Sequence, residues 1–593
     1  MSKLLFAALA VVLIASTTAA SSQELSAADL DKRRKALSDL LKDQWEYVLR
    51  TNPEYASILG DRRYNDRLSD VSEAAVMRDL AASKTFLARL EKIDTANFPE
   101  QEALDKALLA RNLRQAIEST GLKEWEMPVT QISGIHLDTA QLPALLPFAT
   151  TKDYDDYATR LRNFPKQMDD TIAAMRKGMR DRLMPPKFLL EKVVEQANRI
   201  ASQEADKTPF AQPLEKFDDA VPESERARIR AAVLGAIDTA VLPAYKKFAA
   251  FVRDDYAPRG RTDAGMWALP DGAKRYASRV RRSTTTNLSA DEIHQIGLKE
   301  VARIEAEMLA IARKLGFADL KSFRASLDTN ANLRAKSREQ ILELYRQYID
   351  QMYTKLPQLF GRLPKQKVIV VPVEEFREQE AAGASYQQGA PDGSRPGRVE
   401  VNTGNATSRK TISMESTAYH EGVPGHHMQL AIAQELTGLP DFRRFGNGYT
   451  AYDEGWALYS ETLGKEVGFY TDPYNDYGRL QDEMLRAIRL VVDTGLHSKR
   501  WTRVQVVQFF HDHSSEDEVE VQSETDRYIV WPGQALGYKI GSLKIAELRA
   551  RARRELGDRF DIRAFHDEIL GAGPLPMDVL EHRIDAWIAR GKQ

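Results

Sequence analysis

The chain has 593 residues, with 84 basic and 86 acidic side chains and a formal net charge of −2 at neutral pH. This balance gives no electrostatic argument for binding nucleic acid or an anionic membrane surface. The sequence contains no cysteine, which excludes disulfides, lipid attachment through cysteine and thiolate ligands. Any metal site must therefore use histidine and carboxylate side chains.

Residues 1–20 are predicted to be a cleavable secretory signal. Lys3 precedes an apolar run from Leu4 to Ala15, and the small residues Thr18 and Ala20 follow it, which is typical of such signals. The run is too short to span a bilayer stably, and no later stretch reaches about 20 apolar residues. We expect cleavage near Ala20 and a soluble product in the periplasm or the medium, with no membrane insertion afterwards.

Residues 21–285 are predicted to form an N-terminal helical lobe, and residues 286–593 a second lobe that carries the chemistry. A chain of this length can bury a substantial core. Ser289 and Glu292 form the pattern of a capping box at the start of a long helix, just beyond the boundary near residue 285. Apolar residues recur with helical spacing in six earlier segments: Ser26 to Val48, Glu73 to Ile93, Glu100 to Glu118, Asp153 to Arg182, Leu189 to Glu204 and Glu223 to Asp254.

A small β-sheet is predicted in the second lobe. Lys367 to Val373 is a β-branched run, and Arg398 to Thr403 alternates, as strands do. Pro372 favours an edge strand, and such an edge could pair with an extended substrate through main-chain hydrogen bonds. The segment from Gly383 to Gly397 is predicted to be a flexible loop that could close over substrate, using Tyr386, Gln387 and Gln388.

The segment HEGVPGHH, from His420 to His427, carries the strongest functional signal. Imidazole is the commonest ligand of a catalytic zinc ion, and a neighbouring glutamate such as Glu421 can serve as general base. The usual helical motif is HExxH, but Pro424 occupies its last position.

The spacing within this segment requires a break in the helix. On an unbroken helix, His420 and His426 would lie about 9 Å apart along the axis, too far for one ion. Gly422, Pro424 and Gly425 break helices, so we expect a kink or bulge that brings the second histidine beside the first. His427 is the alternative to His426, and a corner with surface histidines is the alternative to a metal site.

Glu454 is the predicted third ligand. It lies in the segment DEGWALYSE, which has helical apolar spacing. Catalytic zinc sites commonly combine two histidines and one glutamate with an open fourth position. Asp453 and Glu461 are competing candidates, and an acidic first turn favoured by the helix dipole is the alternative interpretation.

Arg489, Asp493 and His497 recur every four residues and share one helix face. They are predicted to line the active-site cleft, with His497 oriented by Asp493. A solvated or buried structural network is the alternative. His511-Asp512-His513 is interpreted as a helix end. Further helices are predicted at Ser337 to Phe360, Ala535 to Arg553, Ile562 to Leu570 and Met577 to Arg590.

These motifs carry a resemblance to a known family. HEGVPGH, EGWA and RYIVWPGQAL resemble the pattern HExxPGH, EGWA and RYxxxPGQAL of the bacterial family called domain of unknown function 885, which is regarded as related to gluzincin-type metallopeptidases. The resemblance implies His420, His426 and Glu454 as ligands of one zinc ion and Glu421 as general base. It implies a mainly α, two-lobed helical metallopeptidase-like fold with a small β-sheet beside the metal-binding helix.

A zinc peptidase also needs a donor for the oxyanion of its tetrahedral intermediate. Tyr538 resembles the tyrosine in the corresponding late helix of the Taq-type carboxypeptidases, and Tyr528 and Arg527 are alternatives. Arg527 could instead bind a substrate carboxylate.

The sequence therefore predicts an exported zinc peptidase with peptide substrates. Iron, manganese or cobalt would also suit two imidazoles and a carboxylate. A metal-dependent hydrolase of non-peptide amides or esters, and a non-catalytic peptide-binding scaffold, are the alternative functions. The sequence does not distinguish endopeptidase, aminopeptidase and carboxypeptidase action, and it does not give the oligomeric state.

Overall fold

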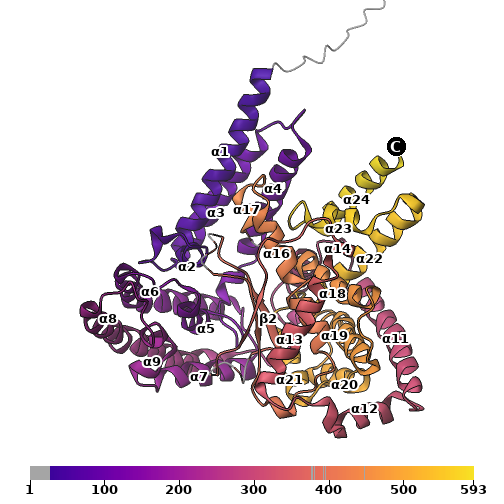
Figure 1. Ribbon diagram of the computed structural model, residues 1–593. Helices are drawn as coiled ribbons and strands as arrows, with labels where there is room; N and C mark the ends of the chain where they lie inside the picture. The colour runs from indigo at the N-terminus through magenta and orange to yellow at the C-terminus, as the bar shows by residue number, and fades with distance from the viewer. Residues whose placement is uncertain (1–26, 376–377, 379–380, 392, 394, 447) are drawn as a thin grey trace, which may run out of the picture.

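The computed structural model describes residues 27–375, 378, 381–391, 393, 395–446 and 448–593. The predicted signal at residues 1–20 lies outside the described residues. The fold is mainly helical with one three-stranded sheet, as the sequence predicts (Figure 1). Among the described helices, none combines the length and the apolar character that crossing a membrane requires.

The N-terminal part contains two groups of helices. The first group, at the upper left of Figure 1, is α1 (Ala27–Thr51), α2 (Pro53–Ile58), α3 (Glu73–Glu91) and α4 (Glu100–Gly121). The second, at the lower left, is α5 (Ile135–Gln141), α6 (Thr151–Asp181), α7 (Lys187–Ala201), α8 (Glu223–Ala236) and α9 (Leu242–Phe251). The predicted helix from Glu223 to Asp254 contains two π-helical stretches, Ile237–Val241 and Val252–Tyr256.

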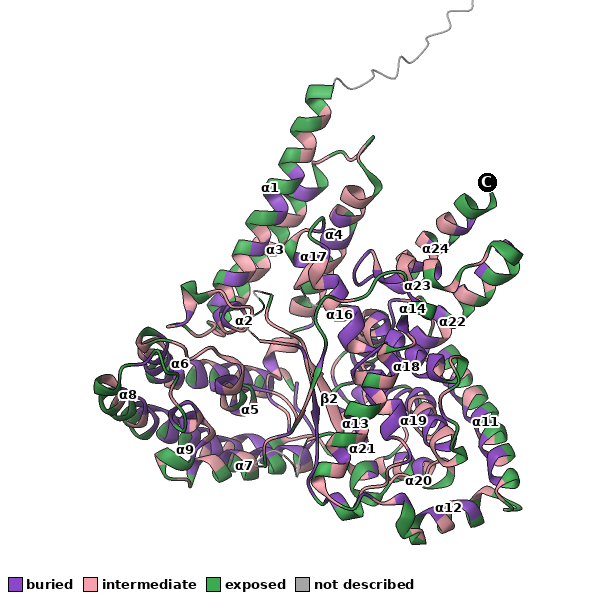
Figure 2. Ribbon diagram, in the orientation of Figure 1, coloured by how far each residue is buried: buried purple, intermediate pink, exposed green. Residues whose placement is uncertain are grey.

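The hydrophobic cores group the helices differently from the predicted lobes. A cluster of buried residues from Val129 to Ala257 belongs to the second N-terminal group alone. Leu37 of α1 and Leu109 of α4, in contrast, share one core with Trp456 and other residues of the C-terminal half. In Figure 2 the buried residues are densest around α18 and α19. The boundary near residue 285 stays a prediction, but the first helices pack against the C-terminal half.

The sheet has the order β1-β3-β2. β1 (Ile369–Pro372) pairs in parallel with β3 (Arg398–Val401), so Pro372 lies on an edge strand as predicted. β2 (Ala384–Gln387) pairs antiparallel with β3. The prediction of a flexible loop over the whole of Gly383 to Gly397 is therefore wrong at β2, because pairing with β3 overrides the weak strand propensity of this short segment.

The C-terminal half is helical around this sheet. The capping box of Ser289 and Glu292 is present at the start of α11, and the predicted helix from Ser337 ends at Tyr353. The helices from residue 272 onwards are α10 (Gly272–Thr284), α11 (Ala290–Lys314), α12 (Leu320–Thr329), α13 (Arg338–Tyr353), α14 (Leu356–Leu359), α15 (Met414–Glu421), α16 (His426–Glu435), α17 (Asp441–Arg444), α18 (Thr450–Glu466), α19 (Pro473–His497), α20 (Arg503–His513), α21 (Glu518–Val530), α22 (Leu536–Leu556), α23 (Ile562–Leu570) and α24 (Met577–Lys592).

Helices α18 and α22 cross at a contact between two glycines. A Cβ atom on Gly455 would lie 2.5 Å from the Cα of Gly541, and one on Gly541 would lie 1.7 Å from the carbonyl oxygen of Ala451. Only glycine permits so close an approach of two backbones. The crossing brings α22, which carries Tyr538, against the helix that carries Glu454.

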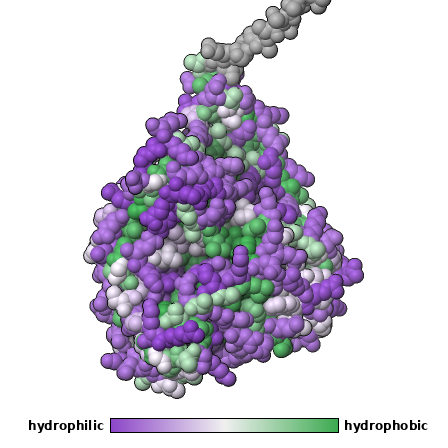
Figure 3. Space-filling view, turned by 90° about the vertical axis from the view of Figure 1, so that its right-hand side faces the viewer, coloured by the Kyte–Doolittle hydropathy of each residue, from purple (hydrophilic) through white to green (hydrophobic). Residues whose placement is uncertain are grey.

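The surface is largely polar. On the face seen in Figure 3, hydrophilic residues dominate, and hydrophobic residues gather towards the middle of the face. Trp531 and Ile369 are among the few large apolar side chains that are substantially exposed.

Candidate metal centre

The helix breaks between the two histidines, as the sequence predicts. α15 ends at Glu421 and α16 begins at His426. The Gly425 amide donates to the carbonyl of Tyr419 at 3.0 Å, and the His427 amide donates to the carbonyl of Gly422 at 3.1 Å. A Cβ atom at Gly425 would lie 1.9 Å from the carbonyl oxygen of His420, so the turn requires glycine there. The Val423–Pro424 peptide within the turn is cis.

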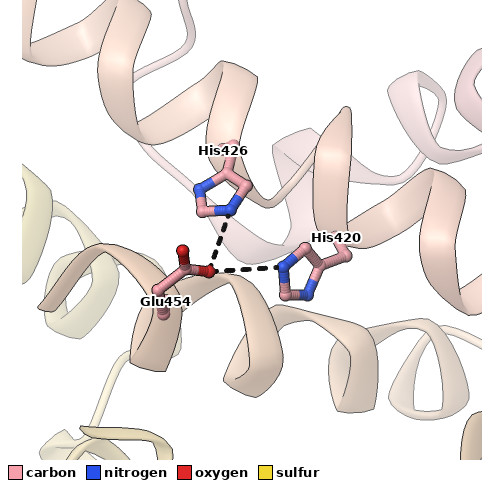
Figure 4. Close-up of side chains that lie close together, drawn as sticks. All are labelled: His420, His426 and Glu454. Carbon is pink, nitrogen blue, oxygen red and sulfur yellow. Dashed lines mark ion pairs between the residues drawn. The ribbon is translucent and has the colours of Figure 1, made fainter. Parts of the chain in front are cut away.

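This turn brings His420, His426 and Glu454 together (Figure 4). Nε2 of His426 lies 3.3 Å from Oε2 of Glu454, and Nε2 of His420 lies 3.7 Å from the same oxygen. The three ligand atoms all lie within 4.8 Å of one another, and they are the sole such group found among the described residues. Two imidazoles and a carboxylate that face one point form the donor set of a catalytic zinc site.

Glu461 supports the first histidine from behind. Nδ1 of His420 lies 2.8 Å from Oε1 of Glu461, so Nδ1–H donates to this carboxylate and Nε2 faces Glu454. Such a partner fixes the tautomer and the orientation of a metal-binding histidine. The sequence analysis considered Glu461 only as a competing ligand. Its spacing of seven residues from Glu454, two helical turns on the same face, was the available signal.

Each residue of the segment Glu454-Gly455-Trp456 makes a different contact. Glu454 faces the histidines, and Gly455 allows the contact with α22 described above. The indole Nε1 of Trp456 donates to the carbonyl of Pro424 at 2.8 Å. Helix α18 therefore supplies a candidate ligand and also holds the turn between the other two candidate ligands. Asp453 is turned elsewhere and accepts a hydrogen bond from Gln429.

His427 does not join the cluster. Its Nε2 lies 2.9 Å from the carbonyl oxygen of Gln366, and its Nδ1 lies 3.1 Å from the hydroxyl of Tyr386. Burial lowers the pKa of His427 to about 4, so it is neutral under ordinary conditions. The structure thus selects His426 over His427, and it gives Tyr386 a fixed partner where the sequence analysis expected a mobile loop.

The charges of the cluster depend on one another. Burial alone would lower the pKa of His420, but hydrogen bonds with Glu454 and Glu461 raise it to about 9. Burial would likewise raise the pKa of Glu454, yet the two histidines hold it well below its usual range. Burial raises the pKa of Glu421, and the nearby charges of His420 and His426 oppose that shift. Glu421 is thus a half-buried carboxyl within electrostatic reach of both histidines.

Tyr538 lies on α22, which packs against α18, and it contacts Arg527. Nη2 of Arg527 lies 3.2 Å from the hydroxyl oxygen of Tyr538. Burial raises the pKa of Tyr538, and the charge of Glu454 raises it further, which places the phenol within electrostatic reach of a ligand. Tyr528, the other tyrosine considered, instead bonds to Glu524 and accepts from Nε of Arg489 at 3.0 Å.

His497 has a different environment from the one predicted. Its Nδ1 accepts from the Met266 amide at 3.0 Å, and its Nε2 lies 2.9 Å from the carbonyl oxygen of Tyr528. Asp493 does not orient it, because that carboxylate accepts from the Tyr276 hydroxyl and the Gly533 amide. Backbone groups therefore use both ring nitrogens, and we interpret His497 as a structural residue rather than a catalytic one.

His511 and His513 lie at the end of α20, as interpreted from the sequence, and they have separate partners. His511 lies 2.8 Å from Glu518, and His513 lies 2.9 Å from Glu305.

Comparison with known proteins identifies the family. The model of the family described as "Bacterial protein of unknown function (DUF885)" matches residues 53–584, so the chain belongs to this family. No curated protein matches the chain.

Two solved structures have a similar fold. One, described as a putative lipoprotein from Colwellia psychrerythraea, is 29% identical, with a TM-score of 0.89 over 94% of this chain and 99% of that one. The other, described as a putative lipoprotein of unknown function from Shewanella oneidensis, is 17% identical, with a TM-score of 0.70 over 93% of this chain and 99% of that one. The second likeness concerns the fold alone.

Proposed function

We propose that the protein is an exported zinc-dependent peptidase. The observation that carries the proposal is the convergence of His420, His426 and Glu454 within 4.8 Å, with Glu421 directly beside the first ligand. Export is supported by the signal-like N-terminus and by the description of both similar structures as lipoproteins.

The residues fit a zinc ion on chemical grounds. Two imidazoles and one carboxylate leave a fourth position for water, which is the donor set of a catalytic rather than a structural site. The carboxylate of Glu461 behind His420 adds the outer partner that metal-binding histidines usually have. When bound, the metal would supply a water of lowered pKa and a Lewis acid for the substrate carbonyl.

Glu421 is the proposed general base. Its carboxylate would take a proton from the attacking water and later deliver it to the leaving amine. A carboxyl whose pKa is raised by burial holds that proton more readily between the two steps than an exposed one would.

Tyr538 is the proposed oxyanion donor, with Arg527 supporting it. The phenol would donate a hydrogen bond to the oxygen that becomes negatively charged in the transition state. The Arg527 guanidinium lies 3.2 Å from the phenol oxygen and donates to it. The hydroxyl proton of Tyr538 would therefore point away from Arg527 and towards the substrate. Strand β2, which packs against α15, offers main-chain groups to an extended peptide.

The Glu421→Gln variant tests the proposal. It should bind zinc in the same stoichiometry as the parent while peptide hydrolysis falls by about 100-fold or more, since general base catalysis supplies 10²–10⁴-fold. Zinc content by atomic spectroscopy and hydrolysis of a mixed peptide library are the two measurements. A variant that hydrolyses peptides as fast as the parent would rule out this role for Glu421.

A further inference from the structure

Two arginines share a single carboxylate beside the candidate metal centre. Nη2 of Arg489 on α19 lies 2.8 Å from Oε2 of Glu524, and Nη1 of Arg527 on α21 lies 3.1 Å from Oε1 of the same side chain. The guanidinium of Arg489 also lies over the ring of Tyr538, 4.6 Å from its centroid. We call Arg489, Arg527, Glu524 and Tyr538 the arginine pair site. Its two full positive charges face one full negative charge.

The arginine pair site has donors that no protein group uses. Arg489 is only 4% exposed, yet its Nη1 has no hydrogen-bond partner within the described part of the chain, and neither has Nε of Arg527. Leaving a buried charged donor unpaired is costly. An anionic ligand at this place would remove that cost.

Glu520 lies one helical turn before Glu524 on α21. It makes no hydrogen bond or ion pair with either arginine across the residues that the structure describes. Glu520 is solvent-exposed, and the charges of Arg489 and Arg527 oppose the rise of its pKa. It is thus within electrostatic reach of both arginines, but it bonds to neither of their spare donors.

A large cavity lies next to the arginine pair site, separated from it by Gln534. Arg527 donates to Oε1 of Gln534 at 2.8 Å, and Gln534 lines a cavity of about 940 Å³. Thr450, one turn before Glu454 on α18, lines the same cavity. Its other lining residues include the aromatic side chains of Trp45, Phe86, Tyr449 and Trp531. Cavities of roughly 300–1,000 Å³ hold ligands of the size of a drug molecule.

We propose that Arg527, together with Arg489, binds the C-terminal carboxylate of the peptide substrate, so that the protein is an exopeptidase acting near the C-terminus. This inference rests on the proposed function. The planar guanidinium fork matches a carboxylate in geometry and charge. A peptide amide in the same place would leave the arginine donors with a poorer partner, and an internal peptide segment would offer no anion.

The direct test compares two peptides of identical sequence, one ending in a free carboxylate and one in an amide, with the zinc-loaded full chain. The carboxylate peptide should have a kcat/KM about 30-fold or more higher, as expected when one partner of a buried charge pair is removed. In the Arg527→Gln variant this preference should fall to near unity. Arg527→Lys, which keeps the charge and an ion pair with Glu524, should retain only part of it.

Arg551→Gln is the matched control. The Arg551 side chain is 21% exposed against 22% for Arg527, and it is likewise held by carboxylates, those of Glu547, Glu581 and Asp585. It lies on α22 away from the arginine pair site, so its removal should leave the preference for the free carboxylate unchanged.

Binding to the zinc-loaded Glu421→Gln variant separates this inference from the proposed function. Calorimetry should show tighter binding of the carboxylate peptide than of the amide. If the parent hydrolyses neither peptide but the carboxylate peptide still binds more tightly, the peptidase proposal fails and the carboxylate site stands. Equal hydrolysis of both peptides by the parent, or an undiminished preference in Arg527→Gln, would overturn the inference. The inference would also be overturned if hydrolysis required a free amino terminus and did not depend on the C-terminus. Comparing each peptide with its N-acetylated form tests this.

Discussion

Histidines in the same half of the molecule show two opposite arrangements. At the candidate metal centre, His420 and His426 turn their Nε2 atoms towards one carboxylate oxygen of Glu454, at 3.7 and 3.3 Å. On α19, His497 uses Nδ1 and Nε2 for the backbone of Met266 and Tyr528. A histidine with both nitrogens satisfied by backbone groups has no lone pair for a metal or a proton. Convergence of two imidazole nitrogens on one carboxylate, rather than burial or the proximity of an aspartate, distinguishes the candidate functional cluster.

The largest expected difference in zinc binding is between variants of the two neighbouring histidines, His426 and His427. His426→Ala should abolish both stoichiometric zinc binding and hydrolysis, because it removes one of three ligands. His427→Ala should keep zinc, because His427 contacts Tyr386 and Gln366 instead. Metal analysis of the two purified variants measures the difference. Loss of zinc in the His427 variant, with zinc retained in the His426 variant, would reverse the assignment.

The next contrast concerns the carboxylate behind His420. Glu461→Gln should weaken zinc affinity by about 10–100-fold, the usual effect of removing such a partner, while leaving the stoichiometry at saturation intact. Competition with a chelator measures the affinity. Glu466→Gln, at the end of the same helix and paired with Arg549, is the control and should bind zinc like the parent. Equal affinities in all three proteins would show that Glu461 does not support the metal centre.

The close contact between Gly455 of α18 and Gly541 of α22 positions the helices that carry Glu454 and Tyr538. A substitution at Gly455 can disturb this contact without changing Glu454 or Tyr538. Gly455→Ala should lower the free energy of unfolding by about 1–3 kcal/mol, the usual cost of overpacking, because its Cβ would lie 2.5 Å from Gly541. Gly438→Ala, where no atom lies within 4 Å of the added Cβ, should be close to neutral. Denaturant unfolding of both variants checks this. A Gly455 variant as stable as the parent would mean that the helices can separate at little cost.

The last contrast concerns the structural histidine and the pH. Burial lowers the pKa of His497 from 6.5 to about 3, so the folded state favours its neutral form. The stability this gives is complete above pH 6.5 and is lost as the pH falls towards 3, by about 1.4 kcal/mol for each pH unit.

The His497→Gln variant tests the direction of this pH dependence of stability. Glutamine can accept from the Met266 amide and donate to the Tyr528 carbonyl but does not titrate. Its unfolding free energy should therefore fall less steeply than that of the parent between pH 6.5 and 3, and its zinc content should be unchanged. Parallel pH profiles would contradict the burial of a neutral His497, and lost zinc would contradict its structural assignment.

The sequence predicted most helices because their apolar spacing and caps are local signals, as at Ser289 and Glu292. It predicted the broken helix because Gly422, Pro424 and Gly425 lie between the two histidines. It could not choose between His426 and His427, because the choice depends on how the turn closes on the carbonyls of Tyr419 and Gly422. Spacing alone placed His497 near Asp493, but partners from distant segments, Met266 and Tyr528, decide its role.

The cores show the same limit at a larger scale. Helices α1 and α4 precede the predicted boundary at residue 285, yet Leu37 and Leu109 pack in the core that contains Trp456. Periodicity shows which face of a helix is buried but not which partner covers it. Strand β2 was missed for the same reason, since its pairing with β3 is a tertiary contact.

The central claim is that His420, His426 and Glu454 hold one metal ion. An anomalous-scattering map collected at the zinc edge from crystals of the protein as purified tests it most directly. The account predicts a single strong peak within coordination distance of Nε2 of both histidines and a carboxylate oxygen of Glu454. A map with no peak among these three side chains, or with its peak on other ligands, would contradict it.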